Sequence, residues 1–199
     1  MVLNMRIFAK GAEAVLYKGK LFGIPILVKS RLEKRYRIPQ IDENLRKHRT
    51  RKEAILLHRA KACGVRCPYV FYVGKFDIVM EFLKGRLMRD SRITPSITRE
   101  VGEYLAKLHR GGIIHGDYTP ANILVGKEIA VIDFGLGSFS TDIEDRATDV
   151  LLMKKSIPEN MFRAFLDGYS INADIQLILR QVEEIEKRGR YVVRKMAEG

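Results

Sequence analysis

The sequence predicts an α+β protein of two small lobes, with a β-rich first lobe and a minimal helical second lobe. Its 199 residues are the length of a single domain. Apolar residues make up 46% and charged residues 30%, a composition typical of chains that fold around a core. Short β-rich runs fill residues 1–83, whereas helical spacing dominates residues 84–199, so we place the lobe boundary near Leu83.

The first lobe is predicted to combine strands with one long helix. Runs rich in β-branched residues predict strands near 15–17 and 26–28, with glycine and proline between them. A basic, irregular stretch follows, and a helix is expected over 44–63. Two further strands are expected at 70–73 and 77–82.

The second lobe is predicted to be mostly helical. A helix that places Val101, Leu105 and Leu108 on one face should be capped by Ser96 or Thr98. The later elements are expected as short strands at 113–114, 123–125 and 129–132, helices at 160–167 and 172–187, and a basic tail from 188 onward.

The net charge is +12, from 36 Lys and Arg against 24 Asp and Glu. The whole excess lies in residues 1–80, which hold 18 basic and 6 acidic residues. Such asymmetry indicates an acidic partner for this part of the chain, such as nucleic acid. A solvated basic helix face accounts for the same charge equally well.

The two cysteines, Cys63 and Cys67, are too few for a disulfide framework, and their C-x3-C spacing does not suit a zinc site. We expect both to be reduced. The N-terminal residues 1–11 lack the apolar region of a signal peptide, and no apolar run approaches the ~18 residues of a membrane span. A soluble, cytoplasmic protein without membrane contact is therefore expected.

The most informative segment runs from His115 to Asn122 and is followed by the sequence Asp-Phe-Gly at 133–135. Strand-like runs flank both segments, so Asp117, Asn122 and Asp133 could be presented together at neighbouring strand ends. Carboxylate and carboxamide oxygens suit Mg²⁺ better than zinc. The plainer interpretation is that Asp117 and Asn122 satisfy backbone groups of a turn.

This pattern resembles the protein kinases, whose signature joins a catalytic loop H-R-D-x-x-x-x-N to a later D-F-G. The resemblance implies a bilobal, protein-kinase-like fold that uses ATP and Mg²⁺. It implies Asp117 as the group that accepts the proton of the attacking hydroxyl, and Asn122 and Asp133 as Mg²⁺ ligands. It also implies that Lys29 contacts the α- and β-phosphates, while Glu53 holds this lysine in place.

Further residues would form the nucleotide pocket by the same resemblance. Gly11, Ala12, Glu13 and Ala14 stand where kinases cover the phosphates, although they include one glycine where the usual loop has three. A plain β-turn explains this segment equally well. Met80, Glu81 and Leu83 stand at the connection between the lobes, where the backbone of Glu81 and Leu83 would hydrogen-bond adenine.

Longer stretches resemble the small atypical serine/threonine kinase and ATPase subunit of the KEOPS complex, of the archaeal type. That family takes part in forming threonylcarbamoyladenosine on tRNA, beside a subunit that carries the threonylcarbamoyl-transferase site. The implied partners are this subunit, other KEOPS subunits, and tRNA bound through the basic first lobe and the tail. The similar stretches are 29–39, 41–45, 49–54, 115–122, 132–137 and 144–149, and the basic tail residues are Arg188, Arg190, Arg194 and Lys195.

The chain departs from ordinary protein kinases at three points. Gly116 replaces the arginine that pairs with a phosphate in regulated kinases, and Thr119 replaces a lysine near the γ-phosphate. Only 66 residues follow Asp133, which leaves little room for a peptide-docking platform. ATP hydrolysis, autophosphorylation or phosphorylation of a bound partner is therefore expected rather than broad protein phosphorylation.

Two other functions remain open at this point. Small-molecule kinases, such as the aminoglycoside and choline phosphotransferases, share the H-x-D-x-x-x-x-N pattern. A non-catalytic, tRNA-binding scaffold would explain the basic charge through phosphate contacts. The presence of Asp117, Asn122 and Asp133 together favours catalysis over the scaffold, and we expect a catalytic subunit that also contacts tRNA.

Overall fold

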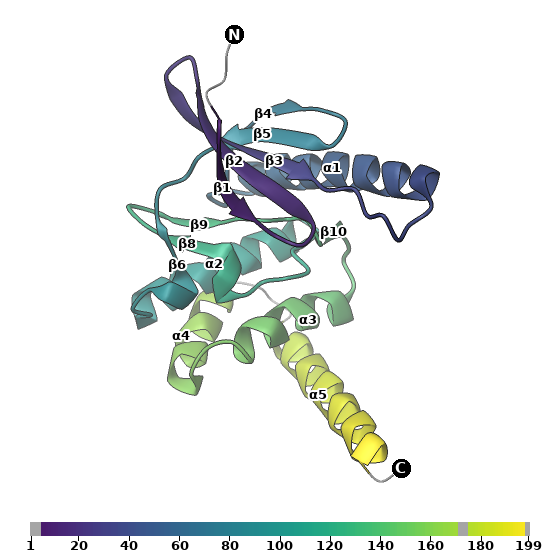
Figure 1. The fold of residues 1–199 in the computed structure, drawn as a ribbon. Helices are drawn as coiled ribbons and strands as arrows, with labels where there is room; N and C mark the ends of the chain where they lie inside the picture. The colour runs from purple at the N-terminus through teal and green to yellow at the C-terminus, as the bar shows by residue number, and fades with distance from the viewer. Residues whose placement is uncertain (1–4, 171–174, 198–199) are drawn as a thin grey trace.

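The computed structural model describes residues 5–170 and 175–197, with side chains up to residue 188. A five-stranded antiparallel sheet forms the N-lobe, in the order β1-β2-β3-β5-β4 (Figure 1). In the central strand, Lys29 lies opposite Ile78 of the neighbouring strand. The predicted strands are confirmed, and one more lies at the edge of the sheet. They are β1 (Arg6–Lys10), β2 (Ala14–Leu21), β3 (Ile24–Arg31), β4 (Val70–Val73) and β5 (Asp77–Glu81).

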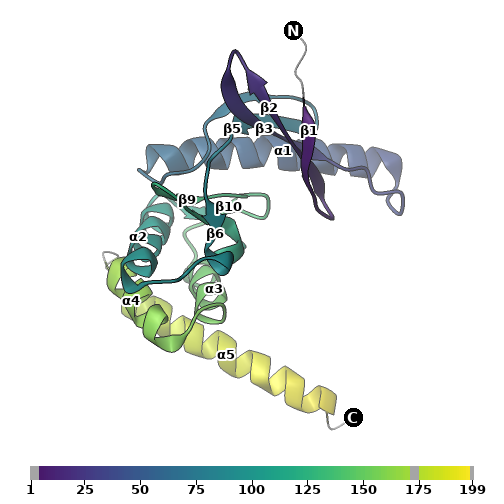
Figure 2. The same cartoon turned by 60° about the vertical axis from the view of Figure 1, so that its left-hand side comes forward.

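Helix α1 (Pro39–Ala62) runs along one face of this sheet (Figures 1 and 2). It begins at Pro39, so the predicted start near residue 44 is wrong. A proline suits the first turn of a helix, because the N–H that it lacks would have no helical partner there. Asp42 is buried in the same turn and accepts a hydrogen bond from Arg46 Nε at 2.6 Å. This pairing draws the basic stretch into the helix.

Within the described residues, the C-lobe is built from four helices and several short elements. The helices are α2 (Pro95–Arg110), α3 (Ile143–Lys154), α4 (Glu159–Tyr169) and α5 (Ile175–Ala197). The short strands pair in the orders β6-β8-β9 and β10-β7. These elements are β6 (Arg86–Leu87), η1 (Met88–Asp90), β7 (Ile113–Ile114), η2 (Pro120–Asn122), β8 (Ile123–Val125), β9 (Ile129–Val131) and β10 (Ser138–Phe139).

The N-terminal cap of α2 differs from the prediction. Thr94 is the cap, because its side chain accepts a hydrogen bond from the N–H of Ile97 at 3.4 Å. Pro95 then fills the first helical position. The hydroxyl of Thr98 donates back to the Thr94 carbonyl at 3.1 Å, so Thr98 already lies inside the helix, as does Ser96.

Helix α5 continues beyond the predicted end at 187 and reaches Ala197. It projects away from the rest of the C-lobe toward its end (Figure 2). The predicted start at 172 lies outside the described residues. The side chains of Arg190, Arg194 and Lys195 also lie outside them. Among the described residues, no helix combines the length and the apolarity needed to cross a membrane.

The C-lobe core depends on a close crossing of α2 and α4. Gly102 on α2 faces the backbone of Phe165, and Gly168 on α4 faces the backbone of Arg99. A Cβ at Gly102 would lie 2.1 Å from the Phe165 carbonyl oxygen, and one at Gly168 would lie 1.9 Å from that of Arg99. Only glycine allows this approach, which supports the core of the C-lobe.

Candidate active site

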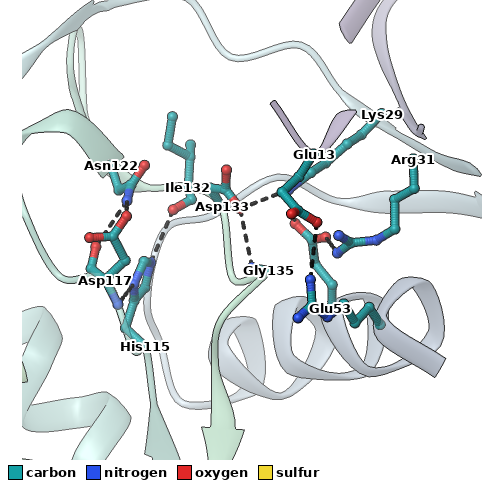
Figure 3. Close-up of polar contacts among 11 residues, drawn as sticks. Glu13, Lys29, Arg31, Glu53, His115, Asp117, Asn122, Ile132, Asp133 and Gly135 are labelled. Atoms are coloured by element: carbon teal, nitrogen blue, oxygen red, sulfur yellow. Dashed lines mark hydrogen bonds and ion pairs between the residues drawn. The ribbon is translucent and has the colours of Figure 1, made fainter. Parts of the chain in front are cut away.

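Asp117 and Asn122 lie in the segment between β7 and β8, at the base of the N-lobe sheet. The side-chain amide of Asn122 donates to the Asp117 carbonyl oxygen at 2.9 Å and to Asp117 Oδ2 at 2.8 Å. These two bonds fix the carboxylate relative to its own backbone. These bonds agree with the turn interpretation of the pair. They leave the amide oxygen of Asn122 pointing away from Asp117 (Figure 3).

His115 connects this segment to the strand end that carries Asp133. The N–H of Asp117 donates to Nδ1 of His115 at 3.3 Å, while Nε2 of His115 donates to the carbonyl oxygen of Ile132 at 3.0 Å. One ring nitrogen therefore accepts and the other donates, which is the pattern of a neutral imidazole. The ring also packs against Phe134, with 4.7 Å between the ring centroids. Asp117 and Asp133 are thus held in a fixed relationship.

Asp149 of α3 anchors the same segment from below. Its carboxylate is fully buried and accepts the backbone N–H of His115 at 2.7 Å and that of Gly116 at 2.9 Å. Burial lowers the pKa of His109, so this ring is neutral and donates from Nε2 to the same carboxylate at 3.3 Å. We did not predict this role from the sequence. An acidic residue on the buried face of a helix was the available signal.

Lys29, Glu53 and Asp133 meet where the two lobes face each other. Lys29 Nζ donates to Glu53 Oε1 and to Asp133 Oδ1, both at 2.7 Å. Lys29 and Glu53 are buried, whereas the Asp133 side chain is half-exposed. Figure 3 shows Asp133 between the Lys29–Glu53 pair and the Asp117–Asn122 pair. The structure thus brings together the five residues for which the sequence predicted roles in catalysis or metal binding.

The electrostatics of this cluster favour its charged forms. Burial alone would lower the pKa of Lys29, but the carboxylates of Glu53 and Asp133 outweigh it and raise this pKa above the usual value. Burial alone would raise the pKa of Asp133, but the charge of Lys29 and its hydrogen bond lower it instead. Both groups are therefore ionised at neutral pH.

The backbone of Asp133 is in the left-handed region, with a φ of 60°. Few residues other than glycine adopt this conformation, and it concentrates at functional sites. The N–H of Gly135 donates to Asp133 Oδ1 at 3.1 Å and helps to hold the carboxylate in place. Both described contacts of the carboxylate fall on Oδ1, so Oδ2 is the oxygen available to a cation.

Two adjoining hollows lie between the lobes, and Lys29 and Asp133 line both. The first is an apolar cavity of about 370 Å³ whose walls include Leu27, Met80 and Leu83. This size and lining suit a planar base. The second has about 420 Å³ and is lined by the turn from Gly11 to Ala14 and by side chains including Lys29, Arg31, Arg49, Asp117 and Asp133.

The turn from Gly11 to Ala14 is held by the segment that follows β3. The Gly11 N–H donates to the Ala14 carbonyl at 2.9 Å, which closes the turn. Arg49 of α1 pairs with the Glu13 carboxylate at 3.0 Å, and Lys34 donates to the Ala12 carbonyl. The side chains of Arg49 and Lys34 hold the turn from outside. The turn therefore does not need the three glycines of the usual kinase loop.

The connection between the lobes forms the inner wall of the apolar cavity. The N–H of Glu81 donates to the Tyr69 carbonyl at 2.8 Å, so of the two backbone groups of Glu81 the carbonyl is the one that could meet a base there. The Glu81 side chain turns outward and pairs with Arg66 at 2.6 Å. Met80 and Leu83 line the cavity itself. Glu81 therefore has a structural contact beyond the role that the sequence predicted.

A metal ion between the lobes would depend on the oxygen donors of Asn122 and Asp133. No cluster of three or more His, Cys, Asp and Glu suited to a metal occurs within the described part of the chain. Asn122 lines the first cavity and Asp133 lines both hollows, so each offers an oxygen between the lobes, and Mg²⁺ commonly uses one or two protein ligands together with phosphate oxygens and waters. The residues present fit a magnesium ion that arrives with a phosphate ligand.

A β-rich N-lobe above a helical C-lobe, with these side chains between them, defines the fold of the protein kinases. The Rio2 kinase–ADP/Mg²⁺–phosphoaspartate complex from Chaetomium thermophilum has the same fold, with a TM-score of 0.69 and 17% identity over 96% of this chain and 72% of that chain. The sequence profile of the RIO domain matches residues 28–165. The chain belongs to the RIO-domain family, among the relatives of the archaeal KEOPS subunit Bud32.

Two relatives match the chain over nearly its whole length. It is 37% identical to the KEOPS complex subunit Bud32 of Pyrococcus abyssi, over 94% of this chain and 96% of the relative. It is 44% identical to the probable bifunctional tRNA threonylcarbamoyladenosine biosynthesis protein of Methanothermobacter thermautotrophicus, over 93% of this chain. The chain spans only 36% of the length of that bifunctional relative. The predicted family resemblance is confirmed.

The alternative of a small-molecule kinase shares the fold and differs in family. A macrolide 2′-phosphotransferase from Brachybacterium faecium superposes with a TM-score of 0.61 at 16% identity. Identity at this level establishes the fold alone. The match to the RIO domain and the relatives at 37% and 44% identity therefore distinguish the chain from the antibiotic phosphotransferases.

Proposed function

We propose that the chain binds ATP with Mg²⁺ between its lobes and catalyses transfer of the terminal phosphoryl group to a hydroxyl or to water. The observation that carries this proposal is the contact of Lys29 with both Glu53 and Asp133 at 2.7 Å, between an apolar cavity and a second hollow that Asp117 lines. A buried ion-pair cluster without a ligand would be a costly way to stabilise a fold. Buried ion pairs of this kind are, however, a common part of phosphate-binding sites.

In this mechanism the protein positions the reactants and neutralises charge. Asn122 and Asp133 would hold Mg²⁺, which offsets the negative charge of the phosphates when bound. Lys29, oriented by Glu53, contacts the α- and β-phosphates. Asp117 accepts the proton of the attacking hydroxyl and is aimed by its bonds with Asn122. With water as the acceptor the chain is an ATPase, and with Ser or Thr it is a kinase.

We propose further that this activity serves tRNA threonylcarbamoyladenosine formation within a KEOPS complex. The names of the relatives support this, because one is a KEOPS subunit and others are bifunctional proteins of that biosynthesis. The threonylcarbamoyl-transferase subunit and other KEOPS subunits are then the partners. The cytoplasm, where tRNA is modified, is the expected location.

The decisive experiment measures phosphate release and protein labelling from γ-labelled ATP, with and without the transferase partner and tRNA. Lys29→Ala and Asp133→Ala should each abolish release. Arg99→Ala removes one charge from an exposed pair with Asp167, neither of which lines the two hollows, and should leave release unchanged. Undiminished release in both site variants would exclude the proposed roles.

Direct contact with tRNA is a separate proposal that rests on charge. The basic residues of α1, including the exposed Arg51, belong to the N-lobe that carries the entire charge excess. Binding through phosphates should weaken by about 10³-fold between 50 and 200 mM salt, if roughly six phosphates are neutralised. A tRNA affinity that stays constant over this range would contradict an electrostatic contact.

A further inference from the structure

Arg31 is a buried cation with a donor that stays unsatisfied within the described residues. Its side chain is 5% exposed, and Nη2 donates to Glu53 Oε2 at 2.6 Å. The Nε atom is buried and has no hydrogen-bond partner in the described part of the chain. Leaving a buried charged donor unsatisfied costs free energy that a folded protein normally avoids. An anion that completes these bonds is therefore expected beside Arg31.

The position of Arg31 along β3 indicates which anion this is. Side chains two residues apart on a strand share one face, so Leu27, Lys29 and Arg31 all face the space between the lobes. Leu27 lines only the apolar cavity, Lys29 lines both hollows, and Arg31 lines only the second one. Two residues of strand span about 6–7 Å. Along the strand, Arg31 thus lies two residues farther than Lys29 from the apolar cavity that suits the base.

The charges around Arg31 also change when a cation is bound. In the structure, Lys29 and Arg31 face the carboxylates of Glu53 and Asp133, so the four charges balance. If Asp133 turns to a metal ion, two cations remain against the single carboxylate of Glu53. The excess positive charge then lies at the second hollow, which Arg49 also lines while it pairs with Glu13. A phosphate group at that point would restore the balance.

We propose that Arg31 binds the terminal phosphate of the nucleoside triphosphate through the guanidinium nitrogens that Glu53 leaves free. Lys29 would bind the α- and β-phosphates and Arg31 the terminal phosphate. Glu53 orients both cations, Lys29 through Oε1 and Arg31 through Oε2. A planar guanidinium suits this double task, because its nitrogens can bond a carboxylate and a phosphate at once. The assignment rests on the proposed ATP site and specifies how that site distinguishes ATP from ADP and AMP.

The test compares the affinities of ATP, ADP and AMP, each with Mg²⁺, for the wild-type chain and for Arg31→Ala. ATP binding should weaken about 10- to 100-fold, as expected for a lost charge-assisted contact, whereas AMP binding should change less than about twofold. Arg99→Ala is the matched control for the loss of one positive charge and should alter none of the three. Glu53→Gln should weaken ATP and ADP alike, because it disturbs both cations.

Three outcomes would overturn the assignment. Equal weakening of all three nucleotides by Arg31→Ala would mean that Arg31 only supports Glu53. If this variant does not fold, the affinities of the wild-type chain provide the test. Equal affinity of the wild-type chain for ATP and ADP would leave no role for Arg31 at the terminal phosphate. A wild-type chain that binds no ATP would remove the proposed function together with this inference. If the wild-type chain binds ATP and Arg31→Ala weakens all three nucleotides equally, the inference alone is removed.

Discussion

The carboxylate of Asp149 accepts a hydrogen bond from the backbone N–H of His115 at 2.7 Å, although 34 residues separate them in the sequence. The same carboxylate accepts the N–H of Gly116, so one buried side chain satisfies two successive backbone donors. These two backbone donors belong to the segment between β7 and β8, which carries Asp117. The position of the proposed catalytic carboxylate is therefore set by a helix that carries no other part of the site.

Asp149→Asn should reduce both activity and stability. The amide keeps one acceptor but turns an N–H₂ group toward a backbone donor, and the free energy of unfolding should fall by about 3 kcal/mol. Displacement of Asp117 should lower phosphoryl transfer by roughly 100-fold. Denaturant unfolding and phosphate release measure the two effects. Asp145→Asn, on the exposed face of the same helix, is the control and should change neither. Equal effects in both variants would argue against an anchoring role.

The stability of the chain should depend on pH through Asp133. Its pKa in the folded state is lowered, because Lys29 outweighs the effect of burial, so the ionised carboxylate stabilises the folded chain above the usual pKa of 3.8. This contribution should decline as the pH falls below about 4 and vanish below the folded-state pKa. The difference in unfolding free energy between wild type and Asp133→Asn, measured without nucleotide, should therefore shrink on acidification. A difference that grows toward low pH would contradict the ion pair.

Arg66 should stabilise the connection between the lobes. It pairs with Glu81 at 2.6 Å and with Glu128 of the β8–β9 turn at 3.2 Å, and its hydrogen bonds lower the pKa of Glu81. A double-mutant cycle of Arg66→Ala with Glu81→Gln should give a coupling of about 1 kcal/mol, the upper range for partly exposed pairs.

The exposed pair of Arg99 and Asp167 provides the comparison for this cycle, because its atoms are 3.4 Å apart and both side chains are more than half exposed. Its coupling should stay within a few tenths of a kcal/mol. The same coupling in the two cycles would show that Arg66 contributes no more than an ordinary surface ion pair.

Gly168→Ala should destabilise the C-lobe, although alanine favours an isolated helix over glycine by ~1 kcal/mol. The new Cβ would lie 1.9 Å from the backbone oxygen of Arg99, and separating α2 from α4 should cost about 1–3 kcal/mol. Gly74→Ala is the control, since its nearest atoms are 3.5 Å away. Thermal and denaturant unfolding measure both variants. A more stable Gly168→Ala chain would show that the helices separate freely.

Patterns contained within short windows of sequence predicted most of the strands and the existence of α1, α2, α4 and α5, but they did not predict α3. The ends were less predictable. Thr94, Ser96 and Thr98 are all capable caps, and only the packed helix shows which one has the correct backbone angles. The start of α1 at Pro39 depends on Asp42 finding Arg46 while both are packed against the sheet, which no local pattern specifies.

The sequence by itself determined the lobe order, the family, and the predicted chemistry of Lys29, Glu53, Asp117, Asn122 and Asp133, because residue type and spacing carry that information. Tertiary structure alone decided how these groups are held. Asp149 and Arg31 lie outside the H-x-D-x-x-x-x-N and D-F-G patterns, and their importance comes from burial beside polar groups that are distant in sequence. The energetic cost of leaving such groups unpaired appears only when the chain is folded, so their partners could not be predicted from spacing.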